Sequence, residues 1–144
     1  MRLRLILFSC AAMANPLVSA LQRWLTPSDK IDAIDALIQA QPPWILIVTA
    51  LVLVLVMPVL EELFFRGLCW WALRMICSAR LAGALIAVLF AVLHGWPAAL
   101  WLMPLAAVLS VLRARHGLAE CVSAHCGWNF GAVVLPWMVS CAIS

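Results

Sequence analysis

Polar side chains suited to catalysis interrupt the apolar stretches of this chain. A carboxylate beside an imidazole can turn water into a nucleophile, and an amide with a second imidazole can stabilise the oxyanion formed on an attacked carbonyl. Glutamate, histidine and asparagine supply these groups here, so the sequence predicts hydrolysis of an amide bond. The residues concerned are Glu61, Glu62, Arg66, His94, His125 and Asn129.

The spacing of these residues groups them on helical faces. Residues four apart share one face of a helix, so Glu62 can pair with Arg66, and His125 can lie beside Asn129. Each charge buried near the centre of a bilayer costs roughly 3 kcal/mol on insertion scales, and residues retained at that cost usually mark a functional site.

The predicted depths of the polar residues also agree. With a rise of about 1.5 Å per residue, the distance from the nearest helix-end arginine is ~20 Å for Glu61, ~21 Å for His94 and ~15 Å for His125. We therefore expect helices distant in the chain to meet around one polar cluster. In this cluster Glu61 and His94 would share a water, and His125 with Asn129 would face the oxyanion.

Each group taken alone also has a simpler interpretation. Glu62 and Arg66 would form an exposed ion pair at a helix end. His94 would be a polar residue at the membrane interface. His125 and Asn129 would form an interhelical hydrogen-bond pair worth about 1 kcal/mol. The predicted site would be absent only if all three of these simpler interpretations were correct.

The composition identifies a membrane protein. Of 144 residues, 67% are hydrophobic and 10% are charged, and the mean hydropathy is +1.12. Soluble domains carry about a quarter charged residues. The net charge of +3, without a basic run, gives no indication of nucleic-acid binding.

The apolar stretches predict an all-α, polytopic bundle of transmembrane helices. The turn at Gly95-Trp96-Pro97 divides an apolar stretch too long for one crossing, which needs about 20 residues. Four core helices are expected around residues 44–76, 80–95, 98–114 and 118–141, with a further helix at the N-terminus. The chain divides into an N-terminal membrane helix or signal-like segment (1–22), an amphipathic extracytoplasmic connector (23–42) and a catalytic core (43–144).

The N-terminal segments have two further features. Residues 1–20 fit a signal peptide or an uncleaved first membrane helix, and we favour the helix. Residues from Thr26 to Ala40 fit a short surface helix capped by Ser28. Gly127 and Gly131 form a small-xxx-small pattern that allows close helix packing.

Arginine residues gather at alternate ends of the predicted helices. The positive-inside rule places these ends in the cytoplasm and the C-terminus outside. The arginines are Arg2, Arg4, Arg74, Arg80, Arg113 and Arg115.

Three short motifs together resemble those of a known family. EELFFR from Glu61 to Arg66 matches EExxxR, FAVLH from Phe90 to His94 matches FxxxH, and HCGWN from His125 to Asn129 matches HxxxN. Their order and spacing resemble the CPBP or Abi family of intramembrane proteases, which includes the type II CAAX prenyl endopeptidases. The resemblance covers roughly residues 44–141.

The resemblance implies a role for each matching residue. Glu61 would be the catalytic base, His94 would help it hold water, and His125 with Asn129 would form the oxyanion pocket. The supporting residues would be Glu62, Arg66 and Phe90. No metal cofactor is expected, and zinc held by Glu61, His94 and His125 is the alternative.

The resemblance also implies a location and partners. We expect a multi-pass protein of a bacterial-type inner membrane that cleaves a membrane-associated protein or peptide, such as a C-terminal sorting tail or a bacteriocin-type peptide. The larger family members carry more membrane helices than this chain offers, so prenyl-tail recognition is not expected. The alternative function is a non-enzymatic membrane immunity or peptide-binding protein that uses the same polar pocket. The oligomeric state does not follow from the sequence.

Overall fold

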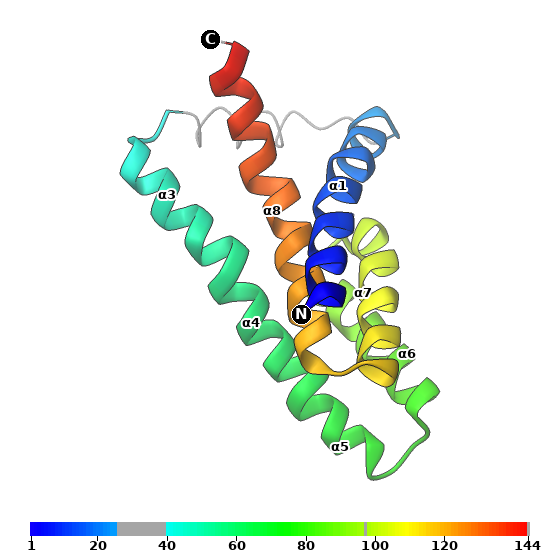
Figure 1. The fold of residues 1–144 in the computed structure, drawn as a ribbon. Helices are drawn as coiled ribbons and strands as arrows, with labels where there is room; N and C mark the ends of the chain where they lie inside the picture. Colours follow the sequence, from blue (N-terminus) through cyan, green and yellow to red (C-terminus); the bar gives the residue numbers. More distant parts are fainter. Residues whose placement is uncertain (26–39, 97, 144) are drawn as a thin grey trace.

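The computed structural model describes residues 1–25, 40–96 and 98–143. Nearly all of these residues are helical, and no strand occurs among them, which confirms the predicted all-α class. The helices are α1 (Arg2–Leu25), a continuous helix over residues 43–74, α6 (Ala79–Leu93), α7 (Ala98–Arg115) and α8 (Leu118–Ile143). In Figure 1 they form one bundle, in which α8 lies between α1 and the continuous helix, coloured from cyan to green.

The continuous helix contains two π-helical stretches between its α-helical parts. It consists of α3 (Pro43–Leu51), the π-helical turn η1 (Val52–Val56), α4 (Met57–Glu62), a second π-helical stretch η2 (Leu63–Cys69) and α5 (Trp70–Arg74).

The first π-helical turn has a local cause in Pro58. Proline has no N–H to donate, and its ring clashes with the carbonyl four residues earlier, which here belongs to Val54 inside η1. A wider turn relieves that clash. Wider turns of this kind are frequent at functional sites, and here they flank the short α4 that carries Glu61 and Glu62.

The turns between α6 and α7, and before α6, follow from their residues. Ser78 caps α6, and its hydroxyl accepts a hydrogen bond from the Leu81 N–H at 3.3 Å. Gly95 has φ of +77°, a conformation that glycine adopts without strain. The predicted break after His94 is therefore present, and α7 begins at Ala98.

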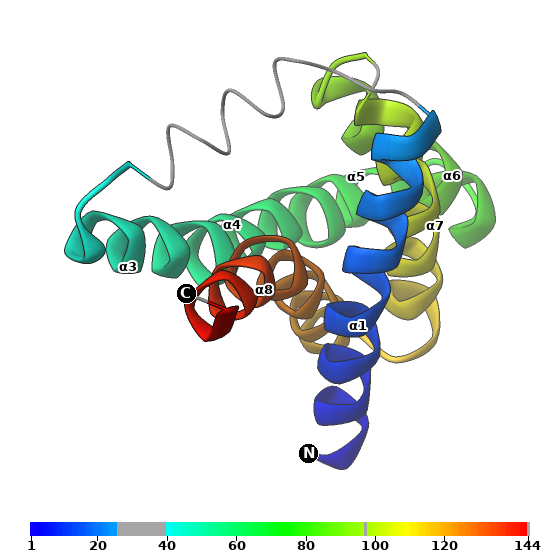
Figure 2. The same cartoon turned by 90° about the horizontal axis from the view of Figure 1, so that it is seen from above.

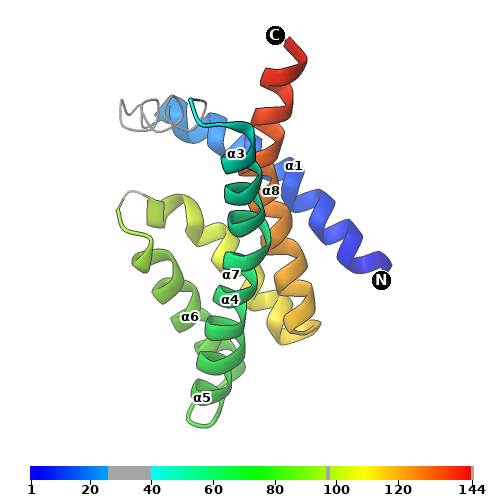
Figure 3. The same cartoon turned by 90° about the vertical axis from the view of Figure 1, so that its left-hand side faces the viewer.

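The closest helix pair is α1 with α8. Gly127 lies against the backbone of Phe8, and Gly131 lies against the backbone of Ala12, so that a Cβ atom at either glycine would overlap that backbone. The predicted small-xxx-small contact is therefore made, and its partner is α1. Figure 3 shows α1 crossing α8 obliquely, and the Phe8 and Phe130 rings meet beside the crossing at 5.6 Å between centroids.

The other strong pairing joins α6 to α7, and the two helices lie side by side in Figures 1 and 2. α8 contacts α4 and η1 of the continuous helix as well as α7. α8 therefore links the N-terminal helix to the helix that carries the EExxxR motif.

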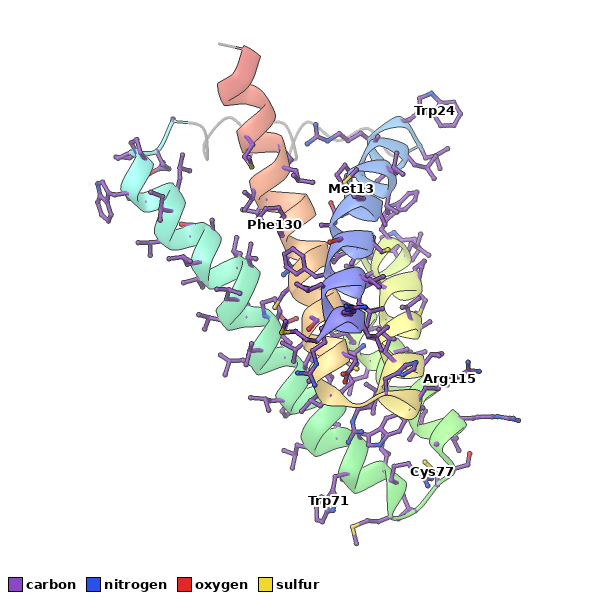
Figure 4. All side chains as sticks on the ribbon, in the orientation of Figure 1. Met13, Trp24, Trp71, Cys77, Arg115 and Phe130 are labelled. Atoms are coloured by element: carbon purple, nitrogen blue, oxygen red, sulfur yellow. The ribbon has the colours of Figure 1, made fainter. Side chains whose placement is uncertain are left out.

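The helices are suited to a membrane. Among the described residues, three helices are long and apolar enough to cross a bilayer, namely α1, the continuous helix and α7, and α6 is a shorter apolar helix. Large hydrophobic side chains cover the outside of the bundle. Trp24 and Trp71 are exposed near opposite ends of the molecule in Figure 4, as expected for side chains at the two membrane interfaces. The chain is a multi-pass membrane protein.

Two predictions about the bundle stay open. The predicted cytoplasmic turns before α6 and after α7 lie toward one end of the molecule, and the C-terminus lies at the other (Figure 1), while the sidedness itself stays a prediction. The surface helix predicted from Thr26 to Ala40, with its cap at Ser28, lies outside the described residues except at Ala40.

Candidate active site

A buried ionic network lies where α4 meets α8. One oxygen of Glu62, Oε1, accepts hydrogen bonds from Arg66 Nη1 at 2.9 Å and from His125 Nδ1 at 2.9 Å. The Glu62 and Arg66 side chains are 0% exposed, and that of His125 is 4% exposed. The four-residue spacing on one helix therefore produces a buried pair, and the third member comes from a helix 63 positions away in the chain.

Arg66 is held on several sides. Its Nη2 donates to the Ala106 carbonyl of α7 at 3.3 Å, and its guanidinium carbon lies 4.6 Å from the centre of the Phe90 ring. Its own carbonyl, within η2, accepts a hydrogen bond from Arg113 Nε at 2.7 Å. A guanidinium buried with a carboxylate, a carbonyl and an aromatic face has the compensation that a charge in an apolar interior requires.

The network is not fully satisfied within the described part of the chain. Glu62 Oε2 and Arg66 Nε are buried and have no hydrogen-bond partner there. Buried polar atoms without partners are uncommon and often accompany functional sites.

Glu61 occupies a different environment from its neighbour. Its side chain is 22% exposed, and its Oε2 lies 3.6 Å from Nε2 of His125. A water molecule about 2.8 Å from each of these two atoms would complete a triangle, so both groups can bind the same water. Because protein atoms leave part of the Glu61 side chain uncovered, there is room for such a water beside the carboxylate.

The hydrogen bonds of His125 indicate the positions of its protons. An ionised carboxylate only accepts hydrogen bonds, so the contact with Glu62 places a proton on Nδ1. In the neutral ring Nε2 then carries a lone pair toward Glu61 and its water. Glu62 thus fixes the orientation and the tautomer of the imidazole.

His94 lies at the C-terminal end of α6, where it is exposed. Its Nδ1 lies 2.8 Å from the Phe90 carbonyl, to which it can donate, and its ring lies 4.6 Å from the Phe90 ring. Across the described residues no ion pair joins His94 to Glu61, and it is His125 that lies beside Glu61. The sharing of a water by Glu61 and His94 stays a prediction.

Phe90 lies between the two imidazoles. Its ring is fully buried and lies 5.6 Å from the His125 ring, on which it stands edgewise. It also contacts Arg66 and packs edgewise against Phe65 at 5.3 Å. Phe90 therefore connects the FxxxH segment to the other two motifs.

Asn129 is tied to the other side of the site. Its Nδ2 donates to the Leu53 carbonyl, inside η1, at 2.8 Å. Asn129 lies one turn beyond His125 on α8. One amide N–H is thus used to hold α8 against the continuous helix, and the second is available to a ligand.

Two features of the site were not predicted from the sequence. The bond between Glu62 and His125 has no signal in the spacing, because the two residues lie on different helices. Arg113, expected only to mark the cytoplasmic end of α7, also contacts the Trp70 ring, 5.4 Å from its centre, and supports the Arg66 carbonyl. The Pro58 position could have indicated η1, but nothing in the η2 residues indicates a π-helical stretch.

The carboxylates and imidazoles of the site are of the types that bind zinc. Within residues 1–25, 40–96 and 98–143, no group of three or more His, Cys, Asp or Glu side chains is arranged to hold a metal ion.

Comparisons with known proteins bear on the family. The model of the type II CAAX prenyl endopeptidase Rce1-like family matches residues 42–131, which include all three motifs. No curated protein and no solved structure matches the chain.

Proposed function

The chain belongs to the type II CAAX prenyl endopeptidase Rce1-like family, and on that premise we propose that this intramembrane protease uses Glu61 to activate the attacking water. The observation that carries the proposal is the contrast between a partly open carboxylate and the buried network beside it. Glu61 lies 3.6 Å from an imidazole whose orientation is fixed by Glu62.

The proposed reaction begins with a water bound between Glu61 and His125. Glu61 takes a proton from the water as the oxygen attacks the carbonyl carbon of the peptide bond. The carboxyl group then returns that proton to the departing amine. One carboxylate can serve both steps because the leaving nitrogen is bonded to the carbon that the water attacks.

The oxyanion requires donors on the other side of the carbonyl. In the proposal, Asn129 supplies its second amide N–H to the oxyanion. His125 Nε2 first accepts a hydrogen bond from the water, then takes the second proton of that water and donates it as a hydrogen bond to the oxyanion, so that the product leaves as a carboxylate. His94 helps to hold the water or the substrate through Nε2, since its Nδ1 is occupied by the Phe90 carbonyl. Glu62, Arg66 and Phe90 position these groups and do not touch the substrate.

The proposed substrate is a membrane-associated protein or peptide with an unwound segment at the depth of Glu61, in a bacterial inner membrane. Recognition of a prenylated tail forms no part of the proposal. Two classes of substrate fit this description, namely a C-terminal sorting tail and a bacteriocin-type peptide.

A comparison of membrane proteomes tests the proposal. Cells that make the wild-type chain are compared with cells that make Glu61→Gln, and the peptides that differ are quantified. We expect at least one membrane-associated substrate to stay uncut only in the Glu61→Gln cells. If every protein is processed equally, although both forms are present at equal levels, the enzymatic proposal is wrong.

The same strains separate the enzyme from a binding protein. A non-enzymatic immunity protein with the Glu61→Gln change would still protect the cell against a bacteriocin-type peptide. That peptide would be recovered intact from both strains. Loss of protection together with an intact peptide in the variant supports the protease.

A further inference from the structure

A groove between α6 and α7 shares none of its lining residues with the site described above. It encloses about 530 Å³, a volume typical of sites for small molecules. Its walls are formed by alanine, glycine and valine residues, among them Gly83, Ala84 and Ala87. The remaining lining residues are Ser110, Arg80 and Arg115, and no acidic residue lines the groove.

Ser110 is a buried hydroxyl without a partner. It is 6% exposed, and within the described residues its Oγ makes no hydrogen bond. A serine in a helix usually bonds the carbonyl four residues earlier, as Ser123 does to the Ala119 carbonyl at 3.0 Å. For Ser110 that carbonyl belongs to Ala106, which accepts from Arg66 instead. Ser110 lines the groove, while its Oγ is covered by protein atoms and no hydrogen bond among the described residues holds the hydroxyl in that position.

The two arginines lie at one end of the groove. Arg80 is the second residue of α6, Arg115 is the last residue of α7, and both are exposed. In Figure 4, Arg115 lies toward the same end of the molecule as Cys77, which precedes α6 in the chain. Arginines at a helix end, next to the predicted interface, attract the phosphates of anionic lipids and can bind them in a bidentate manner.

We propose that this groove binds one anionic phospholipid. The phosphate lies between Arg80 and Arg115, and the unpaired Ser110 hydroxyl turns into the groove and donates to an ester carbonyl. An acyl chain then lies along Ala84 and Ala87. The order agrees with the helix geometry, because Ser110 lies five residues, or ~7.5 Å, from Arg115 toward the membrane interior. From the helix ends inward, the groove therefore offers two arginines, a hydroxyl and an apolar wall. A phospholipid presents its phosphate, ester carbonyls and acyl chains in the same order.

Native mass spectrometry of the full chain in detergent tests this assignment. The probes are phosphatidylglycerol and phosphatidylcholine with identical acyl chains. We expect one phosphatidylglycerol to bind about tenfold more tightly than phosphatidylcholine. The double variant Arg80→Gln/Arg115→Gln should lose this preference, while Arg2→Gln, which removes an exposed arginine outside the groove, should keep it.

Two further variants test the groove itself. Ala84→Phe fills the groove from an exposed position and should weaken binding of both lipids, whereas Val88→Phe, on the same helix outside the groove, should not. Ser110→Ala should lower the affinity for phosphatidylglycerol about fivefold without destabilising the protein, since it also removes an unpaired hydroxyl.

Several results would overturn the proposal. One is equal binding of both lipids by the wild type. Another is tight binding of glycerol phosphate, which has the same phosphate chemistry without an acyl chain. A dimer that is present in the wild type and lost in Ala84→Phe would assign the groove to a second copy of the chain. None of these results depends on proteolysis, so they leave the proposed function untouched.

Discussion

The continuous helix over residues 43–74 presents two contrasting faces at adjacent residues. On one face Glu62 is fully buried and receives two charge-assisted hydrogen bonds. On the other, Glu61 keeps 22% of its side chain exposed and has one contact at 3.6 Å. Neighbours on a helix point about 100° apart, so identical residues enter different surroundings. The difference supports the proposal that Glu62 positions the site and that Glu61 activates the water.

The largest effect that this contrast predicts is the loss of catalysis in Glu61→Gln. The amide has nearly the same volume and cannot accept the proton of the water, so we expect cleavage to fall by about 10²–10⁴-fold. Turnover of the substrate identified by proteomics measures the loss. The unfolding midpoint in detergent should stay at the wild-type value, and a variant that keeps full activity would remove Glu61 from the mechanism.

The opposite pattern is expected for Glu62→Ala. Removing one partner leaves Arg66 as an uncompensated buried charge, so stability should fall by about 3–5 kcal/mol. Titration of the purified protein with a denaturing detergent measures this change.

A double variant serves as the control for this prediction. Glu62→Leu/Arg66→Leu removes both charges and should lose less stability than Glu62→Ala, because no charge is stranded. If Glu62→Ala is as stable as the wild type, the two faces do not differ as described.

Asn129→Ala tests whether this residue of α8 acts in catalysis, in stabilising the fold, or in both. Loss of an oxyanion donor should reduce turnover by about 10²–10³-fold. Loss of the bond to the Leu53 carbonyl should cost only about 1 kcal/mol in stability. Reduced stability with unchanged turnover of the folded fraction would assign Asn129 to the scaffold alone.

A smaller effect is expected on the buried face from Arg113→Gln. This change removes the bond to the Arg66 carbonyl and the contact with Trp70, so we expect a loss of about 1.5–3 kcal/mol. The control is Arg2→Gln, which removes an exposed arginine outside both proposed sites. Equal stabilities of the two variants would contradict the supporting role of Arg113.

Chelation should have the smallest effect. The proposed mechanism uses a carboxylate base, so we expect the purified enzyme to keep its activity after dialysis against a strong zinc chelator. If activity is lost completely and added zinc restores it, a metal ion rather than Glu61 activates the water.

The helices could be predicted from the sequence because hydrophobicity and turn residues act locally. The predicted range 98–114 agrees with Ala98–Arg115, and the break after His94 follows from Gly95. Likewise, the pairing of Glu62 with Arg66 requires only a helix. The position of Pro58 could have indicated η1, whereas nothing in the residues of η2 indicates a π-helical stretch.

The sequence by itself determined that this chain is a membrane bundle, which residues are polar within it, and which of them share a helical face. Only the tertiary structure decided that His125 lies beside Glu61 while His94 bonds the end of its own helix, and that Gly127 and Gly131 meet α1. The physical reason is that periodicity fixes the direction of a side chain around its own axis, whereas the partner on another helix depends on how whole helices cross and pack.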